Sequence, residues 1–220
     1  MLHVMRTPGE APPAPASAIA LHPLSDPGRP EVEAFVEDVY AHAFDGRARS
    51  HYPFLMSLRD QAGRLLAAAG FRLAAHGPLF LEQYLDEPVE AAVGRVGLGA
   101  RREAIAEIGG LASACPGASL ALFRALAGHL DASGCTHAVA TATRQLRRTF
   151  RRFGLAAELV GPADPGRLGE AAREWGGYYR RDPQVLAGAI APALGGLDGA
   201  ATLALLRRRA EGRAFAGGVQ

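Results

Sequence analysis

The sequence is poor in the residues that build metal centres and disulfides. It has two cysteines, Cys115 and Cys135, in no C-x-x-C pair, and its seven histidines lack the short spacing of metal ligands. A zinc site and a disulfide framework are therefore unexpected. We expect no metal cofactor, and we place the protein in a reducing compartment, the cytoplasm.

Long apolar runs are also absent. No stretch approaches the roughly 18 consecutive apolar residues that a membrane-spanning helix needs. The first twenty residues hold several prolines and no apolar run long enough for a signal peptide. We interpret residues 1–17 as a flexible tail and expect no integral membrane contact.

A strong net charge is missing as well. The 220 residues carry a net charge of +2, from 24 Lys+Arg, all of them arginine, and 22 Asp+Glu. This balance gives no argument for a nucleic-acid partner. With 49% hydrophobic and 21% charged residues the composition is typical of a globular protein with one core.

Apolar residues recur with helical spacing in some segments and as short strand-like runs in others. After Pro30 they stand at i, i+3, i+4 and i+7 (Val32, Phe35, Val36 and Val39), which predicts an amphipathic helix. Further helices are expected over 78–90, which Pro88 should end or bend, and over 122–130, 146–153 and 202–213. Strands are expected over 18–23, 54–58, 65–73, 104–111, 136–143, 156–160 and 184–190.

This order of elements predicts a mixed sheet in an α/β (α+β) fold. The segments 54–58 and 65–73 form an antiparallel hairpin, since Asp60 and Gly63 favour a turn between them. The stretch 104–160 alternates strands and helices and supplies two parallel βαβ units in succession. We expect one domain over 18–192 and a C-terminal helical extension over 193–220.

Glu107 is the most conspicuous polar residue, because it interrupts an apolar strand. A carboxylate buried without a partner costs several kcal/mol, so this side chain is either paired or functional. It could act as a general base with a raised pKa. A structural ion pair with an arginine such as Arg72 would give the same sequence pattern, and the two interpretations stay open.

Small residues follow this strand and lead into a helix. Ser113, Gly117, Ala118 and Ser119 belong to this connection, where exposed backbone N–H groups could bind a phosphate of a cofactor. A plain turn containing Pro116 and Gly117 is the simpler interpretation, which the sequence alone favours.

Charged residues gather in two other places. One helix carries five arginines opposite its apolar side: Arg144, Arg147, Arg148, Arg151 and Arg152. These arginines either form a solvated face or contact an anionic cofactor or an acidic carrier. Glu82, Tyr84 and Asp86 lie among apolar residues between two strands. They line a pocket or they face solvent.

Several strings resemble the bacterial thermostable hemolysin family in the family's order, over roughly 32–190. They are LFLEQYLDEPVE from Leu79, EIGGLAS from Glu107, TATRQLRRTFRRFGL from Thr141, AD at Ala163 and Asp164, and WGGYY from Trp175. The chain departs from the family pattern at Gly110, where asparagine is expected.

That family is in turn similar to the GNAT acyltransferase superfamily. The resemblance implies a GNAT-like, largely antiparallel mixed sheet with a parallel βαβ pair in its second half. The cofactor pyrophosphate would lie at the loop Ser113–Ser119, although only Gly117 and Ala118 match the superfamily's Q/R-x-x-G-x-G/A pattern.

A closer similarity is to acyl-homoserine lactone synthases and long-chain N-acyl amino acid synthases. Their G-x-x-R-L-like strand, P-x-x-L-like segment and glutamate strand are matched in order here. The matching residues are Gly70, Arg72 and Leu73, then Pro78 and Leu81, then Glu107. The arginine of their glutamate strand falls at Gly110 and an early acidic pair is missing, so lactone synthesis from S-adenosylmethionine is not implied.

The resemblance implies an N-acyltransferase that moves a fatty acyl group from acyl-CoA or acyl carrier protein to an amine. Candidate catalytic residues are Glu107 as base, Glu82 and Tyr178. Either Tyr178 or Tyr179 could protonate the leaving thiolate. Arg144 and Arg147 join the loop residues as cofactor contacts. Candidate substrate-binding residues are Arg72, Tyr84 and Asp86. Two alternatives stay open: a membrane-active lytic protein, and a GNAT-like module that binds its ligand without catalysis.

Overall fold

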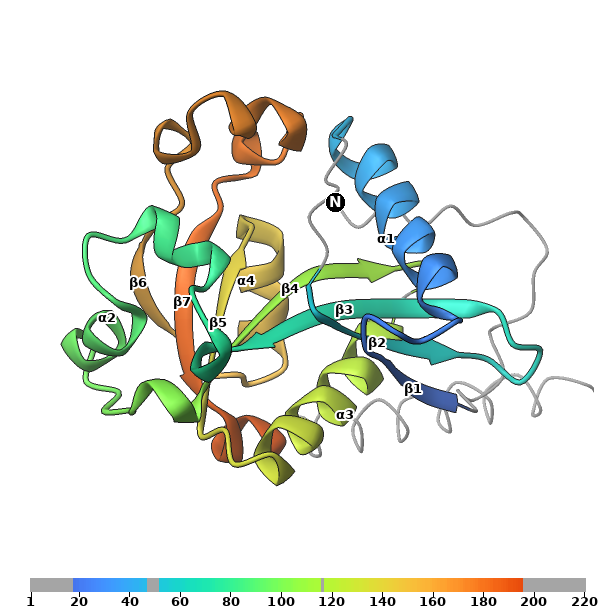
Figure 1. Ribbon diagram of the computed structural model, residues 1–220, viewed down its shortest axis with the longest axis horizontal. Helices are drawn as coiled ribbons and strands as arrows, with labels where there is room; N and C mark the ends of the chain where they lie inside the picture. The colour runs from blue at the N-terminus through green and yellow to red at the C-terminus, as the bar shows by residue number, and fades with distance from the viewer. Residues whose placement is uncertain (1–17, 47–51, 116, 196–220) are drawn as a thin grey trace, which may run out of the picture.

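The computed structural model describes residues 18–46, 52–115 and 117–195. A sheet of seven strands in the order β1-β2-β3-β4-β5-β7-β6 forms its centre (Figure 1). The strands are β1 (Ala18–His22), β2 (Phe54–Arg59), β3 (Leu65–Leu73), β4 (Ile105–Ser113), β5 (His137–Ala142), β6 (Glu158–Pro162) and β7 (Gln184–Ala189).

Helices cover both faces of this sheet. α1 packs on one face, over β2, β3 and β4, and α3 packs on the other face over the same strands. The α-helices are α1 (Arg29–Phe44), α2 (Val89–Arg95), α3 (Ala118–Ala132) and α4 (Arg144–Arg152). Five 3-10 segments complete the fold: η1 (Ala74–His76), η2 (Phe80–Tyr84), η3 (Arg102–Ala104), η4 (Pro165–Trp175) and η5 (Tyr179–Arg181).

The strand pairing confirms the expected GNAT-like mixed sheet. Every neighbouring pair is antiparallel except β4 and β5, which are parallel and joined through α3. The expectation of a second parallel pair, β5 with β6, is wrong. These two strands are not hydrogen-bonded to each other, because β7 lies between them and is antiparallel to both. The long connection through η4 and η5 leads from β6 back to the position between β5 and β6, where β7 forms.

The helix expected over 78–90 is also wrong. The chain forms the short 3-10 segment η2 there, and Leu85 is extended before α2 begins at Val89. Pro88 explains the break, because the residue before a proline is disfavoured in the α conformation. The expected tail (1–17) and the expected helix over 202–213 lie outside the described residues.

β4 and β5 separate part-way along their length. Their pairing covers only Ile105–Ile108 of β4, opposite 137–140 of β5. On its other side β4 has a bulge, because Gly110 and Leu111 both lie opposite the single residue Ala69 of β3. Gly110 adopts φ 58°. This left-handed conformation suits glycine and is tolerated by asparagine, which accounts for the departure from the family pattern.

Candidate functional site

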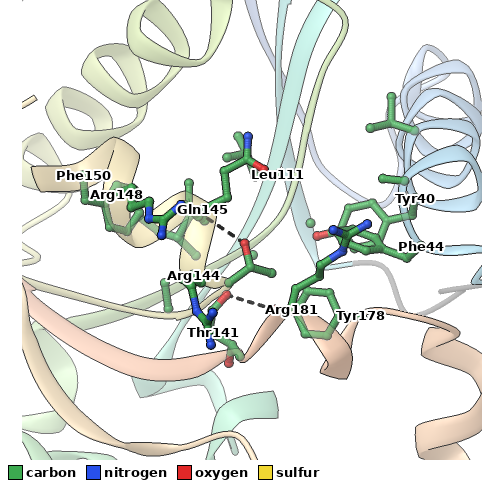
Figure 2. A pocket seen from close by; sticks show the side chains of 18 of the residues that line it. Tyr40, Phe44, Leu111, Thr141, Arg144, Gln145, Arg148, Phe150, Tyr178 and Arg181 are labelled. Atoms are coloured by element: carbon green, nitrogen blue, oxygen red, sulfur yellow. Dashed lines mark hydrogen bonds between the residues drawn. The ribbon is translucent and has the colours of Figure 1, made fainter. Parts of the chain in front are cut away.

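A cavity of about 330 Å³ opens where β4 and β5 separate. Tyr40 and Phe44 of α1 line it from one face of the sheet, and Phe123 of α3 and Phe150 of α4 line it from the other. The two groups of side chains lie across the cavity from each other in Figure 2, with Tyr40 and Phe44 opposite Phe150. The cavity therefore passes through the sheet between the two strands.

The lining combines apolar walls with a basic rim. Ile108 and Leu111 of β4 and Leu146 of α4 add to the aromatic walls. Four arginines also line the cavity, two from α4 and two from η5: Arg144, Arg148, Arg180 and Arg181. Such a surface can accept a long molecule that is apolar at one end and anionic at the other.

Tyr178 is the predicted catalytic residue that lines this cavity. Its hydroxyl donates to the carbonyl oxygen of Thr141 on β5, at 3.2 Å. Its ring packs edge-on against Phe44 and at a tilt against Trp175. Burial raises the pKa of Tyr178 well above its usual value. The phenol is therefore protonated at neutral pH and is a weaker acid than an ordinary tyrosine.

Glu107 is 1% exposed, and its carboxylate is bound from three sides. Backbone N–H groups of Phe80 and Leu81 donate to its two oxygens at 2.8 and 3.0 Å, and the Tyr52 hydroxyl donates at 3.3 Å. Burial raises the pKa of Glu107, although the two backbone hydrogen bonds oppose the shift. A carboxylate with a raised pKa binds a proton more readily than an ordinary one, which suits a general base.

Arg72 is a distant partner of that carboxylate. Its Nε lies 3.9 Å from Glu107 Oε2, and its guanidinium lies 5.3 Å from the centre of the Tyr52 ring. It also donates to the carbonyl oxygen of Pro78. Its Nε is buried without a hydrogen-bond partner among the described residues. The structural ion pair considered from sequence is therefore loose, and most of the bonding to Glu107 comes from backbone.

Tyr52 connects Glu107 with the cavity wall. Its ring lies over Gly70 and Gly109, which are cross-strand partners on β3 and β4. A Cβ on Gly70 would lie 2.6 Å from the ring, and one on Gly109 would overlap with the hydroxyl. Gly109 also lines the cavity. The Tyr52 hydroxyl thus lies between Glu107 and the backbone of the cavity wall.

Gly109→Ala should therefore lower the free energy of unfolding by about 1–3 kcal/mol, because the new methyl group displaces Tyr52. Urea unfolding followed by circular dichroism measures this change. Gly128→Ala is the matched control, since an alanine Cβ at this position of α3 would meet nothing within 4 Å and helix propensity favours alanine there. Equal stability of both variants would contradict the packing described for Tyr52.

Glu82, the third predicted catalytic residue, is occupied by structural contacts. Both of its oxygens are within 3.0 Å of the Arg102 guanidinium. It also accepts from the backbone N–H groups of Leu79 and Val89, so it joins the start of η2 to the start of α2. Pairing with Arg102 lowers the pKa of Glu82 to about 2. We leave Glu82 out of the proposed chemistry.

Tyr84 and Asp86, predicted to bind substrate, do not line the cavity. Tyr84 is buried, and its hydroxyl is 2.7 Å from that of Tyr179. Asp86 is exposed and paired with Arg167. Asp86 therefore faces solvent, whereas Tyr84 neither lines the cavity nor faces solvent. Substrate binding by these two residues stays a prediction.

The predicted phosphate loop contributes none of the residues that line the cavity. Gly117, at φ 88°, precedes α3, which begins at Ala118 without a side-chain cap. Ala118 and Ser119 are buried, and the Ser113 hydroxyl donates to the carbonyl oxygen of Cys115. The role of this loop in binding a phosphate stays a prediction.

The two predicted cofactor arginines of α4 differ in their contacts. Arg147 donates to Ala142 and Asp182, with its Nη2 2.7 Å from the Asp182 carboxylate, and joins α4 to the start of β7. Arg144 lies 3.4 Å from the same carboxylate and lines the cavity (Figure 2). Arg144 is therefore the stronger candidate for contact with a ligand.

Sequence reasoning missed several lining residues. Tyr40 and Phe44 are interpretable from sequence only as part of an amphipathic helix, and Arg180 and Arg181 follow the recognised WGGYY string without a pattern of their own. Gly176, in that string, adopts φ 53° and packs against the backbone at the end of α1. Within the described ranges, no cluster of histidine, cysteine or acidic residues could hold a metal ion.

The model of the thermostable hemolysin family matches residues 22–194. The chain belongs to this family. No curated protein matches the sequence. Across the described parts of the chain, we find no helix with the length and apolar character required to cross a membrane.

Solved structures share the fold at low sequence identity. TofI in a complex with an inhibitor and MTA is 16% identical, with a TM-score of 0.58 over 83% of this chain and 97% of that one. The acyl-homoserine lactone synthase BjaI, with SAM and isopentyl-CoA, is 13% identical, with a TM-score of 0.56 over 81% and 86%. FeeM, an N-acyl amino acid synthase from uncultured soil microbes, is 14% identical, with a TM-score of 0.52 over 80% and 92%. These likenesses confirm the fold that the family resemblance implied.

Proposed function

We propose that this thermostable hemolysin family member is an N-acyltransferase, which moves a fatty acyl group from a phosphopantetheine thioester to an amine. The cavity between the separated β4 and β5 carries the proposal. It joins apolar walls to a rim of four arginines, which matches a donor that has an apolar acyl chain and an anionic phosphate. Structures with this fold include a synthase with bound isopentyl-CoA and an N-acyl amino acid synthase.

The bulge of β4 supports a role in polarising the thioester. Gly110 and Leu111 line the cavity, and only one β3 residue lies opposite the two of them. A backbone N–H freed by such a bulge can donate to the carbonyl oxygen as negative charge develops on it. No side chain is needed for this donor, which is compatible with glycine at position 110.

Three side chains would move the protons. The amine nitrogen attacks the thioester carbon, the C–S bond breaks, and the nitrogen loses a proton. Glu107 and Tyr52 are not among the residues that line the cavity. Glu107 takes up that proton through the Tyr52 hydroxyl, which donates to the carboxylate and lies next to Gly109 of the cavity wall. Tyr178, whose protonated phenol lines the cavity, gives a proton to the leaving sulfur.

The proposal is tested by filling the cavity. Ala140 lines it at the last position of β5 that pairs with β4, so Ala140→Phe should weaken the binding of an acylated phosphopantetheine at least about tenfold. Calorimetry measures the affinity, and mass spectrometry of reactions with candidate amines detects the amide product. Ala121→Phe, at an exposed position of α3, is the matched control.

Two results would contradict the proposal. One is unchanged affinity in a folded Ala140→Phe protein. The other is a wild-type protein that binds no acylated phosphopantetheine yet releases dye from liposomes, which would favour the lytic alternative.

A further inference from the structure

α4 carries a dense set of arginines on the side that faces away from the core. Its apolar residues Leu146 and Phe150, with Phe153 after it, pack against Leu120 and Phe123 of α3. Arg151 and Arg152, at its end, are exposed. With Arg148, Arg180 and Arg181 they form a surface that we call the arginine face.

The positive charge of the arginine face is not neutralised by carboxylates of the described residues. Asp182 pairs with Arg144 and Arg147, which are not part of it. In the described part of the chain, no carboxylate forms an ion pair with any of its five members. Cations three and four residues apart on one helix repel each other, and this repulsion destabilises the helix. An anionic partner would remove this cost.

The arginine face extends beyond the cavity. Arg148, Arg180 and Arg181 line the cavity, where they can contact a phosphate. Arg151 and Arg152 do not line it, and they follow Arg148 by about one turn of helix. These outer positions suit a partner much larger than the ligand arm, with negative charge spread along its own surface.

A membrane surface fits the arginine face less well than a protein does. Interfacial helices insert apolar side chains between the lipids, next to their basic residues. The apolar side chains of α4 are instead packed on α3. A partner with complementary charge and no need for apolar insertion is favoured.

We propose that the arginine face docks an acidic carrier protein, which delivers the acyl group on its phosphopantetheine arm into the cavity. This inference rests on the proposed function and names its donor. Arg151 and Arg152 would contact acidic side chains of the carrier, and Arg148, Arg180 and Arg181 would contact the phosphate at the base of the arm.

The test compares two probes that carry the same acyl group through a non-hydrolysable amide: an acyl carrier protein and the free phosphopantetheine arm. The double variant Arg151→Ala, Arg152→Ala should bind the carrier about tenfold more weakly, with the affinity for the free arm unchanged. Added salt should weaken carrier binding to the wild-type protein and have less effect in the variant. Arg173→Ala is the control, since Arg173 is exposed on η4 and does not line the cavity.

Equal affinities of the variant and the wild-type protein for the carrier would overturn the docking inference, as would equal weakening for both probes. Tighter binding of the wild-type protein to anionic phospholipid vesicles than to the carrier would overturn it in favour of a membrane. If the wild-type protein binds the free arm as tightly as it binds the carrier, the docking inference fails and the proposed function stands. If neither probe binds, the proposed function fails with it.

Discussion

Glu107→Gln should slow acyl transfer about 10²–10⁴-fold, the range expected when a general base is removed. Glutamine has nearly the same shape and accepts one of the two backbone hydrogen bonds, but it cannot take up a proton. Since the amide –NH₂ then faces the other backbone N–H group, the variant should also be less stable by about 1–3 kcal/mol. Rates are therefore compared per folded molecule, at a temperature where circular dichroism shows both proteins folded.

The pH dependence separates a base from a structural carboxylate. The pKa of Glu107 is raised by burial, so the wild-type rate should begin to fall on acidification at a pH above the usual value of 4.5. This acid limb should be missing from the residual activity of Glu107→Gln. Tyr52→Phe keeps the ring over Gly70 and Gly109 and removes the hydroxyl, so it should slow transfer without the same loss of stability. A folded Glu107→Gln protein with nearly wild-type rates would show that Glu107 is structural.

Glu82→Gln should lower the free energy of unfolding at pH 7 by about 2–3 kcal/mol. The Glu82 pKa falls from 4.5 to about 2 in the folded protein, and each unit corresponds to about 1.4 kcal/mol before solvent screening is discounted. The variant keeps its shape but loses the paired charge next to Arg102. Urea unfolding at pH 7 measures the difference, with Glu87→Gln, at an exposed ion pair with Arg95, as the matched control.

The same difference should depend on pH with a definite sign. Because the folded pKa of Glu82 is lowered, its stabilisation is fully present above pH 4.5 and is lost as the pH falls towards 2. The wild-type protein and Glu82→Gln should therefore converge in stability over this window. A gap that stays constant down to pH 2 would contradict the ion pair as its cause.

Most of the fold could be predicted from the sequence, because local patterns determine it. The hairpin over 54–73, the helix after Pro30 and the alternation over 104–160 follow from side-chain periodicity and turn residues. The insertion of β7 between β5 and β6 could not be predicted, since it depends on where a long irregular connection returns. The η2 segment was missed because its geometry depends on two carboxylates, Glu82 and Glu107, that bind backbone N–H groups.

The candidate site was less predictable than the fold. Glu107 is recognisable from sequence because a charged residue in an apolar strand needs a partner or a function. Its partners in the structure are backbone N–H groups and the Tyr52 hydroxyl, and no rule of sequence spacing relates Tyr52 to Glu107. Tyr178 and Arg144 line the cavity, whereas Tyr84 and Asp86 do not. Sequence indicates which residues are unusual, but the separation of β4 from β5 decides which of them share a cavity.

The central claim is that an acyl donor occupies the cavity between β4 and β5. A crystal structure with an acylated phosphopantetheine, joined by a non-hydrolysable amide, tests it directly. We predict that the arm lies between the two strands, with its carbonyl at the backbone of Gly110 and Leu111 and its phosphate among Arg144, Arg148, Arg180 and Arg181. An arm bound elsewhere on the protein, with the cavity unfilled, would contradict the claim.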